Sequence, residues 1–196
     1  MDIVLASKSP RRSELLARAG VAFRTMDSCA DETLPPDAWD DPAQAVRTLA
    51  ERKAQAVAKR LEDEAEPCLV VGADTIVVVD GVVFGKPCDE EDAFRMIRCM
   101  AGRAHQVMTG VSVWRAGAGS CTSAHGFTET SDVYFRDLSD QDIRDYLACG
   151  ESMDKAGAYA IQGAGRVLVD HFEGDYDNVV GLPSSVPHIL AELNRG

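Results

Sequence analysis

The spacing of apolar and polar positions predicts short strands that alternate with helices. A buried strand is expected over residues 3–6, followed by a helix with Ser9 as its cap and Pro10 at its first position. A second strand is expected over residues 21–26. Residues 27–41 are predicted to form an irregular loop, because prolines and acids interrupt the pattern. This alternation is typical of an α/β domain.

The pattern continues along the chain. A long helix is expected after Asp41, because its apolar residues recur every three or four positions. Two β-rich runs, 69–72 and 75–79, precede Asp80 and Gly81, which predict a hairpin turn. The other expected elements are a helix from 89 to 102, long strands at 105–115 and 128–135 joined by residues 116–120, a helix at 139–148, a strand at 166–172 and a helix at 184–193. Residues 155–165 fit neither period. The paired strands predict a mixed, twisted sheet with flanking helices, within one domain over residues 1–196 in which two lobes could flank a cleft.

Composition narrows the class of protein. The chain has 196 residues, of which 45% are hydrophobic and 27% charged, as in a globular domain with a buried core. Its net charge of −12 disfavours a nucleic-acid polymer as partner, because phosphates are repelled. The apolar run 68–84 is broken by Asp74 and Asp80, so it predicts no membrane span. The six cysteines lack CxxC spacing and no signal peptide is evident, which favours reduced, mostly buried thiols and a cytoplasmic location.

The first candidate site lies where the first strand enters the first helix. Ser7 and Ser9 supply hydroxyls, and Lys8, Arg11 and Arg12 gather positive charge. Free backbone N–H groups and the helix dipole add to an anion-binding site. No Walker spacing is present, and an ordinary helix cap with two solvated arginines explains this segment equally well.

A carboxylate and several lysines form the second group of candidates. Asp74 interrupts the apolar run 69–79, so it must be paired, bind a metal or face a cleft. A strand bend that satisfies the acid through nearby backbone is the alternative. Lys53, Lys86 and Lys155 could each reach a phosphate, but each taken alone is better explained as a surface lysine.

The third group lies in less regular segments. Small residues at 155–163 permit close backbone approach, and Gln162 can both donate and accept at the edge of a base. Tight packing of a helix on the sheet would explain the same glycines. Glu32 would bind a metal only if its proline-rich loop folds over the cleft, and is otherwise a solvated acid. The histidines and cysteines show no metal or nucleophile spacing, so core or surface histidines are expected.

Eight segments in order resemble the Maf family of nucleotide pyrophosphatases. They are LASKSPRRSELL (5–16), ADE ending at Glu32, AERKA (50–54), GADTIV (72–77), GKP (85–87), HQVMTGV (105–111), DKAGAYAIQG (154–163) and NVVGLP (178–183). The resemblance covers nearly the whole chain, and the order of the segments makes it specific. It implies a single Maf-like domain with a mixed α/β fold similar to the inosine-triphosphate pyrophosphatases.

The resemblance also implies roles for individual residues. Asp74 aligns with the catalytic base, and Glu32 and Asp74 align with carboxylates associated with Mg²⁺ or Mn²⁺. The phosphate-binding positions that align are Ser7, Arg11, Arg12, Lys53 and Lys86, and Ser9 is added to them from the helix start described above. The dTTP/UTP branch carries the residues found here as Arg11, Thr75 and Gln162, whereas a branch acting on 7-methyl-GTP often carries Trp, Gln and Glu. Lys8 is a mild departure from relatives with a small residue, and affects at most phosphate affinity.

The expected function is therefore hydrolysis of dTTP, UTP and modified pyrimidine nucleotides to the monophosphate and pyrophosphate. The substrate is a small molecule, no nucleic acid or membrane is expected as partner, and the family is compatible with a homodimer. The alternative from another class is a nucleotide-binding regulator of septum formation that needs no catalysis. A hydrolase of modified or purine triphosphates is the nearer enzymatic alternative.

Overall fold

The computed structural model describes residues 1–195 and shows the expected alternation of elements. The strands are β1 (Asp2–Leu5), β2 (Arg24–Thr25), β3 (Cys68–Val79), β4 (Val82–Phe84), β5 (Ala104–Gly117), β6 (Ser120–Phe135) and β7 (Val169–Glu173). The helices are α1 (Pro10–Arg18), α2 (Pro42–Arg60), α3 (Glu90–Met100), α4 (Asp140–Leu147), α5 (Tyr176–Val180) and α6 (Val186–Leu193). Short 3₁₀ helices are η1 (Pro36–Asp40), η2 (Ala156–Ala158) and η3 (Gly163–Val167). Within residues 1–195, no helix has the length and apolar character needed to cross a membrane.

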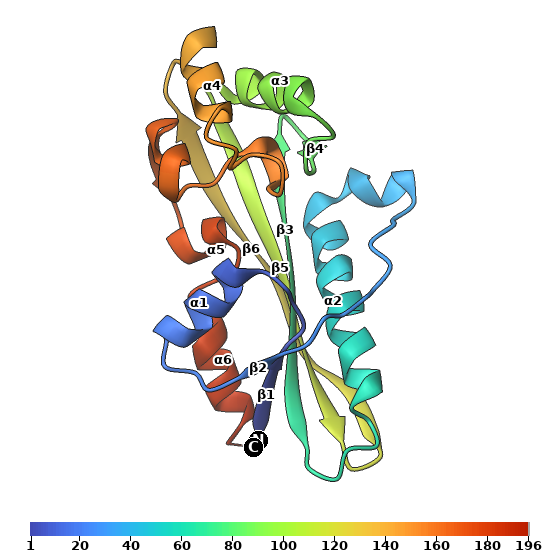
Figure 1. Ribbon diagram of the computed structural model, residues 1–196. Coiled ribbons are helices and arrows are strands. Elements are labelled where there is room, and N and C mark those ends of the chain that lie inside the picture. The colour runs from blue at the N-terminus through green and yellow to red at the C-terminus, as the bar shows by residue number, and fades with distance from the viewer. Residues whose placement is uncertain (196) are drawn as a thin grey trace.

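The strands form the mixed sheet predicted from the sequence. Their order is β2-β1-β3-β5-β6-β7, with β4 paired to β3 outside this path. β1 runs parallel to β2 and β3, whereas β5 is antiparallel to β3 and β6. β5 and β6 form a long hairpin that extends along most of the molecule (Figure 1). Its tight turn places Ala118 and Gly119 at φ values of 54° and 74°.

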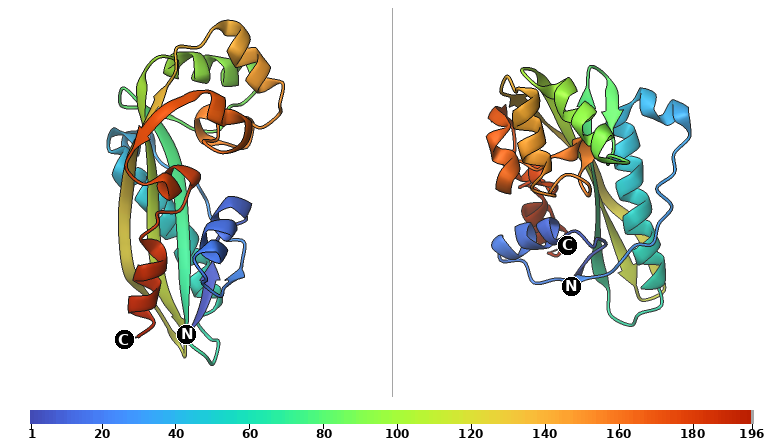
Figure 2. Two further views of the ribbon diagram at one scale, coloured as in Figure 1. Left: turned by 90° about the vertical axis from the view of Figure 1, so that its left-hand side faces the viewer. Right: turned by 45° about the horizontal axis from the view of Figure 1, so that its top comes forward.

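Helices cover both faces of the sheet. α2 lies along one face, and α1, α5 and α6 lie on the other, with α6 running to the end that carries both termini (Figures 1 and 2). α3 and α4 pack against each other at the opposite end (Figure 1). The larger buried cluster lies on the face of α1, α5 and α6, and two smaller clusters lie under α2.

Two glycines bring α2 unusually close to the sheet. A Cβ atom at Gly72 on β3 would lie 2.4 Å from the Ala50 carbonyl oxygen of α2. At Gly110 on β5, it would lie 2.5 Å from the Val46 carbonyl oxygen. Side chains at these positions would therefore push the helix away. The close approach allows Lys53 on α2 to reach β3.

One edge of β3 is left uncovered at its centre. β1 pairs with residues 68–71 and β4 pairs with residues 77–79 of the edge that faces away from β5. Within the described part of the chain, residues 72–76 have no strand neighbour on that edge. Asp74 and Thr75 lie in this gap, and strand alternation turns their side chains to opposite faces.

Several predicted boundaries were wrong. Only Arg24–Thr25 of the expected strand 21–26 pairs with the sheet. β3 is continuous, where two runs were expected, because β5 pairs along its whole length. β6 begins at Ser120, not at 128, for the same reason. Residues 163–167 form η3, so the expected strand 166–172 is shifted to β7. η1 lies in the expected loop 27–41, and α5 was not predicted.

The cysteine prediction was partly wrong. Among residues 1–195 the cysteines are free thiols, as expected. Only Cys68 is buried, whereas Cys29, Cys88 and Cys149 are exposed, because they lie on connections outside the core. His105 is the buried histidine, and His125, His171 and His188 are exposed.

Candidate active site

One cleft of about 1020 Å³ gathers the predicted site residues. It lies beside the uncovered segment 72–76 of β3. The predicted residues that line it are Ser7, Ser9, Arg11, Arg12, Glu32, Lys53, Asp74, Thr75, Lys86 and Gln162. They come from α1, α2, β3 and four connecting segments. The fold therefore assembles in one place the side chains that the sequence scatters over more than half of the chain.

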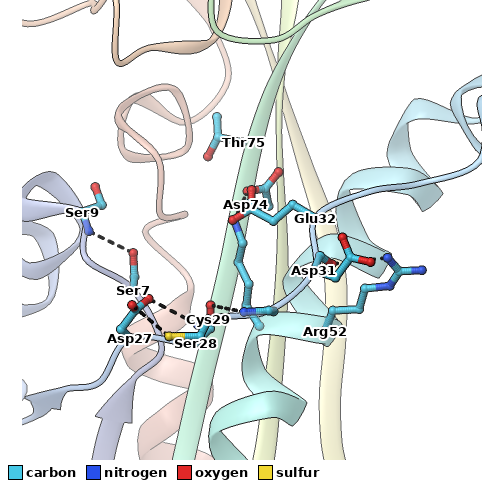
Figure 3. A network of polar contacts seen from close by, with 12 residues as sticks. Ser7, Ser9, Asp27, Ser28, Cys29, Asp31, Glu32, Arg52, Asp74 and Thr75 are labelled. Atoms are coloured by element: carbon cyan, nitrogen blue, oxygen red, sulfur yellow. Dashed lines mark hydrogen bonds and ion pairs between the residues drawn. The ribbon is translucent and has the colours of Figure 1, made fainter.

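A buried lysine joins the two candidate metal-binding carboxylates. Lys53 Nζ lies 2.5 Å from Asp74 Oδ1 and 3.1 Å from Glu32 Oε1. The side chains of Lys53 and Asp74 are only 10% and 15% exposed, whereas that of Glu32 is 59% exposed. The Asp74 and Glu32 carboxylates lie close together, and Thr75 projects on the other side of β3 (Figure 3). Asp74 is therefore a largely buried carboxylate that Lys53 orients within the cleft.

Arginines on α2 hold the Glu32 loop over the cleft. Arg52 donates to the carbonyl oxygens of Asp31 at 3.3 Å and Thr33 at 2.7 Å. Arg60 donates to the Asp27 carbonyl oxygen at 2.6 Å. These bonds fold the loop back, which was the stated condition for Glu32 to act as a metal ligand.

The start of α1 fixes Arg12 in the cleft. Ser9 caps the helix by accepting from the Arg12 amide at 3.5 Å, and Ser7 Oγ accepts from the Ser9 amide at 3.1 Å. The Arg12 guanidinium donates to the Gly181 carbonyl oxygen at 2.8 Å, to Thr75 Oγ1 at 3.1 Å and to Ser7 Oγ at 3.4 Å. Burial lowers the pKa of Arg12 from its ordinary value. The three partners orient the guanidinium before any ligand arrives.

The opposite wall contains a cluster that the sequence did not predict. Lys155 Nζ lies 2.5 Å from Asp154 Oδ1 and donates to the Glu151 carbonyl oxygen at 2.6 Å. Asp154 Oδ2 also lies 3.6 Å from Arg11 Nη1, across the cleft. The hydrogen bond from Lys155 lowers the pKa of the Asp154 carboxyl. The interpretation of Lys53 and Lys155, each taken alone, as surface lysines was wrong, since their side chains are 10% and 13% exposed and line the cleft.

Other cations differ in their accessibility. Lys86, in the turn after β4, is exposed at the cleft margin. Lys8 is also exposed and lies 2.6 Å from Asp27 Oδ2. That hydrogen bond lowers the pKa of Asp27 to about 2. Asp27 therefore holds Lys8 beside the helix start.

The carboxylates fit a divalent ion that arrives with a phosphate ligand. In residues 1–195, no group of three or more His, Cys, Asp or Glu side chains could enclose a metal. Mg²⁺ is usually held by one or two carboxylates together with substrate phosphates and waters. Asp74 and Glu32 supply such a pair of hard oxygen ligands at the cleft floor.

The chain is similar to known proteins over nearly its whole length. A dTTP/UTP pyrophosphatase of Pelotomaculum thermopropionicum is 50% identical over 182 residues, covering 93% of this chain and 91% of that protein. A dTTP/UTP pyrophosphatase of a Thermoanaerobacter species is 46% identical, covering 94% of this chain and 92% of that protein. A solved nucleoside-triphosphatase (dITP/XTP pyrophosphatase) of Mycobacterium abscessus is 12% identical, with a TM-score of 0.44, covering 100% of this chain and 95% of that one. The family model described as Maf-like protein matches residues 2–193. The chain therefore belongs to the Maf family.

Proposed function

We propose that this protein hydrolyses dTTP and UTP to the monophosphate and pyrophosphate. The observation that carries the proposal is Asp74, a carboxylate at the floor of a cleft whose walls supply cations from separate elements. The relatives named dTTP/UTP pyrophosphatase support the substrate class over nearly the whole chain. Arg11, Thr75 and Gln162 line the cleft and support the pyrimidine branch.

The cleft has the size and charge to hold a nucleoside triphosphate. Its volume of about 1020 Å³ matches a site for a ligand of that size. The phosphates would lie across the start of α1, where Arg11 and Arg12 can bind phosphate oxygens through paired N–H groups. Ser7 and Ser9 add polar contacts from the same turn, and Lys86 adds a positive charge at the margin of the cleft.

Asp74 is assigned as the general base. Lys53 occupies Asp74 Oδ1, so Oδ2 is the oxygen that accepts a proton from the attacking water. The water attacks the α-phosphorus, the α–β phosphoanhydride bond breaks, and pyrophosphate leaves. The cations stabilise the charge that develops on the phosphate oxygens. Such a base contributes about 10²- to 10⁴-fold to the rate.

A divalent ion, Mg²⁺ or Mn²⁺, is part of the proposal. Asp74 and Glu32 would hold it, and when bound it would neutralise charge on the phosphates and lower the pKa of a bound water. Lys53 keeps these two carboxylates together, because it contacts both of them.

The test is pyrophosphate release by the purified protein across canonical and modified triphosphates, with Mg²⁺ or Mn²⁺. Release confined to dTTP and UTP, and lost in Asp74→Asn, is the expected result. Release from purine triphosphates alone would refute the substrate class. No release from any nucleotide, with binding still detectable, would favour a nucleotide-binding regulator instead.

A further inference from the structure

A chain of hydroxyl groups crosses the sheet beneath the cleft. Arg12 Nη2 donates to Thr75 Oγ1 at 3.1 Å, and Thr75 Oγ1 lies 3.0 Å from Thr109 Oγ1 on β5. Thr109 Oγ1 in turn donates to the Asn178 carbonyl oxygen on α5 at 3.0 Å. Thr109 and Asn178 are fully buried, and Thr75 lines the cleft. The chain therefore connects a residue at the ligand surface to the protein interior.

The last acceptor in this series of hydrogen bonds, the Asn178 carbonyl oxygen, fixes the direction in which the Thr109 and Thr75 hydroxyl protons point. A carbonyl oxygen only accepts, so Thr109 uses its single proton on Asn178. The Leu182 amide does not compete, since it donates to the Asp177 carbonyl oxygen at 2.9 Å. Thr109 can then only accept from Thr75, and the proton of Thr75 points inward.

Arg12 fixes the remaining hydrogen-bonding role of the Thr75 hydroxyl. A guanidinium only donates, so Thr75 accepts from Arg12 while donating to Thr109. One lone pair of Thr75 is left for a ligand. Thr75 therefore presents a hydrogen-bond acceptor to the cleft and has no proton to offer.

The Asn178 side chain holds the end of this hydrogen-bond series that lies farthest from the cleft. Its side-chain Nδ2 donates to the Val107 carbonyl oxygen at 3.0 Å and to Ser131 Oγ at 2.9 Å. Ser131 Oγ also donates to the Asp175 carbonyl oxygen at 3.0 Å, just before α5. Hydrogen bonds to two strands, β5 and β6, thus hold the residue whose carbonyl receives the Thr109 proton.

We propose that Thr109 is a specificity-determining positioning residue, which sets base preference by holding the Thr75 hydroxyl as an acceptor. This inference rests on the proposed function and deepens it. Phosphate oxygens are acceptors, so Thr75 does not bind them through its hydroxyl. Sugar hydroxyls both donate and accept and are indifferent to the polarity of Thr75. At ring position 3 of a pyrimidine, the group that requires an acceptor is the imide N3–H of uracil and thymine.

Cytosine is the informative competitor. Its N3 atom carries a lone pair where uracil carries a proton, so it would face the lone pair of Thr75. A site built for one polarity discriminates strongly against the other, because a desolvated polar group is left unpaired. The wild-type protein should therefore prefer UTP over CTP.

The experiment measures the ratio of kcat/KM for UTP to that for CTP. Thr109→Val removes the acceptor for the Thr75 proton, which can then turn to cytosine N3, so the ratio should fall by about tenfold. Thr109→Ser keeps the hydroxyl and should keep the wild-type ratio. Ser112→Ala is the matched control, because it removes another buried hydroxyl of β5, one that accepts from Trp114 at 3.1 Å. It should leave the ratio unchanged.

A second substitution tests whether Thr109 acts through Thr75. In a Thr75→Val background, adding Thr109→Val should leave the ratio where Thr75→Val alone puts it. A change in that background, or an unchanged ratio in Thr109→Val with both substrates equally impaired, would overturn the proposal. If Thr109→Val does not fold, Thr109→Ala removes the same acceptor and gives the same measurement.

Binding separates this inference from the proposed function. Calorimetric Kd values for UTP and CTP are measured with Asp74→Asn, with and without Thr109→Val. The preference for UTP should again fall by about tenfold. If no nucleotide releases pyrophosphate but this binding preference shifts, the proposed reaction fails and the role of Thr109 stands. If pyrophosphate is released but neither ratio shifts, the role of Thr109 fails alone.

Discussion

Replacement of Gly72 by alanine should displace α2 from the sheet and impair both stability and turnover. The added Cβ would lie 2.4 Å from the Ala50 carbonyl oxygen, whereas ordinary contacts begin at 3.4 Å. The obstructing atoms belong to the α2 backbone, so the helix itself must move by about 1 Å, the difference between these distances. Overpacking of this kind costs about 1–3 kcal/mol. For a chain of this length each kcal/mol lowers the Tm by about 2–4 °C.

The same displacement should reach the active site. Lys53 lies on α2 and its Nζ is 2.5 Å from Asp74 Oδ1, so a shift of about 1 Å would weaken this contact. Misplacement of catalytic groups by that amount can cost about 10²-fold in rate. The assay combines thermal melting with kcat/KM for dTTP.

Gly126→Ala on β6 is the matched control. A Cβ there lies 3.6 Å from the Val111 carbonyl oxygen, which is ordinary contact. Its Tm and kcat/KM should therefore stay close to wild type. If Gly72→Ala behaved like Gly126→Ala in both measurements, the close approach of α2 would not be what positions Lys53.

Three further predictions follow from the cleft and the core. Asp74→Asn should lower kcat for dTTP by about 10²- to 10⁴-fold, whereas Asp27→Asn, another cleft acid paired with a lysine, should leave kcat nearly unchanged. Equal losses in both variants would argue against Asp74 as the base. Arg12→Lys should lower kcat/KM by about tenfold or more, because one ammonium cannot reach the three oxygens that the guanidinium meets; steady-state kinetics with dTTP would reveal an undiminished value if this geometry were unimportant. Burial lowers the pKa of His105 from 6.5 to about 4, so the unfolded chain takes up this proton first as the pH falls. The stability that the neutral ring contributes is present above about pH 6.5 and lost as the pH falls toward 4, by about 3 kcal/mol in total. Urea unfolding should show a shallower pH dependence for His105→Gln, and an unchanged slope would exclude this residue as its source.

The sequence predicts those elements whose signals are local. Ser9 and Pro10 mark the start of α1, and Asp80 with Gly81 marks a turn that the structure builds with φ values of 49° and 79°. The first half of β6 has no such signal, because residues 120–127 are mostly polar or small. Those residues form a strand because β5 pairs with them. α5 spans only five residues, which is too short for a helical period to show.

The active site was predicted as a set of residues but not as an arrangement. The Maf-like segments identify Asp74, Lys53 and Glu32, yet only the fold shows that one lysine contacts both acids. Thr109 and Asn178 also lie in such segments, within HQVMTGV and NVVGLP. Neither was given a role. For a polar residue among apolar neighbours, the sequence pattern predicts only the strand or helix in which the residue lies. Its partners lie on other elements and are visible only after folding.

The uncovered edge of β3 explains how an acidic protein can hold both the proposed general base and a triphosphate substrate. A strand paired on both edges and covered on both faces would exclude a carboxylate. Between β1 and β4 the edge is open, so Asp74 and Thr75 reach the cleft from opposite faces of the same strand. Asp74 contacts Lys53 of α2, whereas Thr75 contacts Arg12 and Thr109 in the interior of the sheet. Under the proposed roles, general-base catalysis and nucleobase selection belong to adjacent residues that do not share hydrogen-bond partners. A substitution in the Thr109 chain should therefore alter which nucleotide is used without removing the general base.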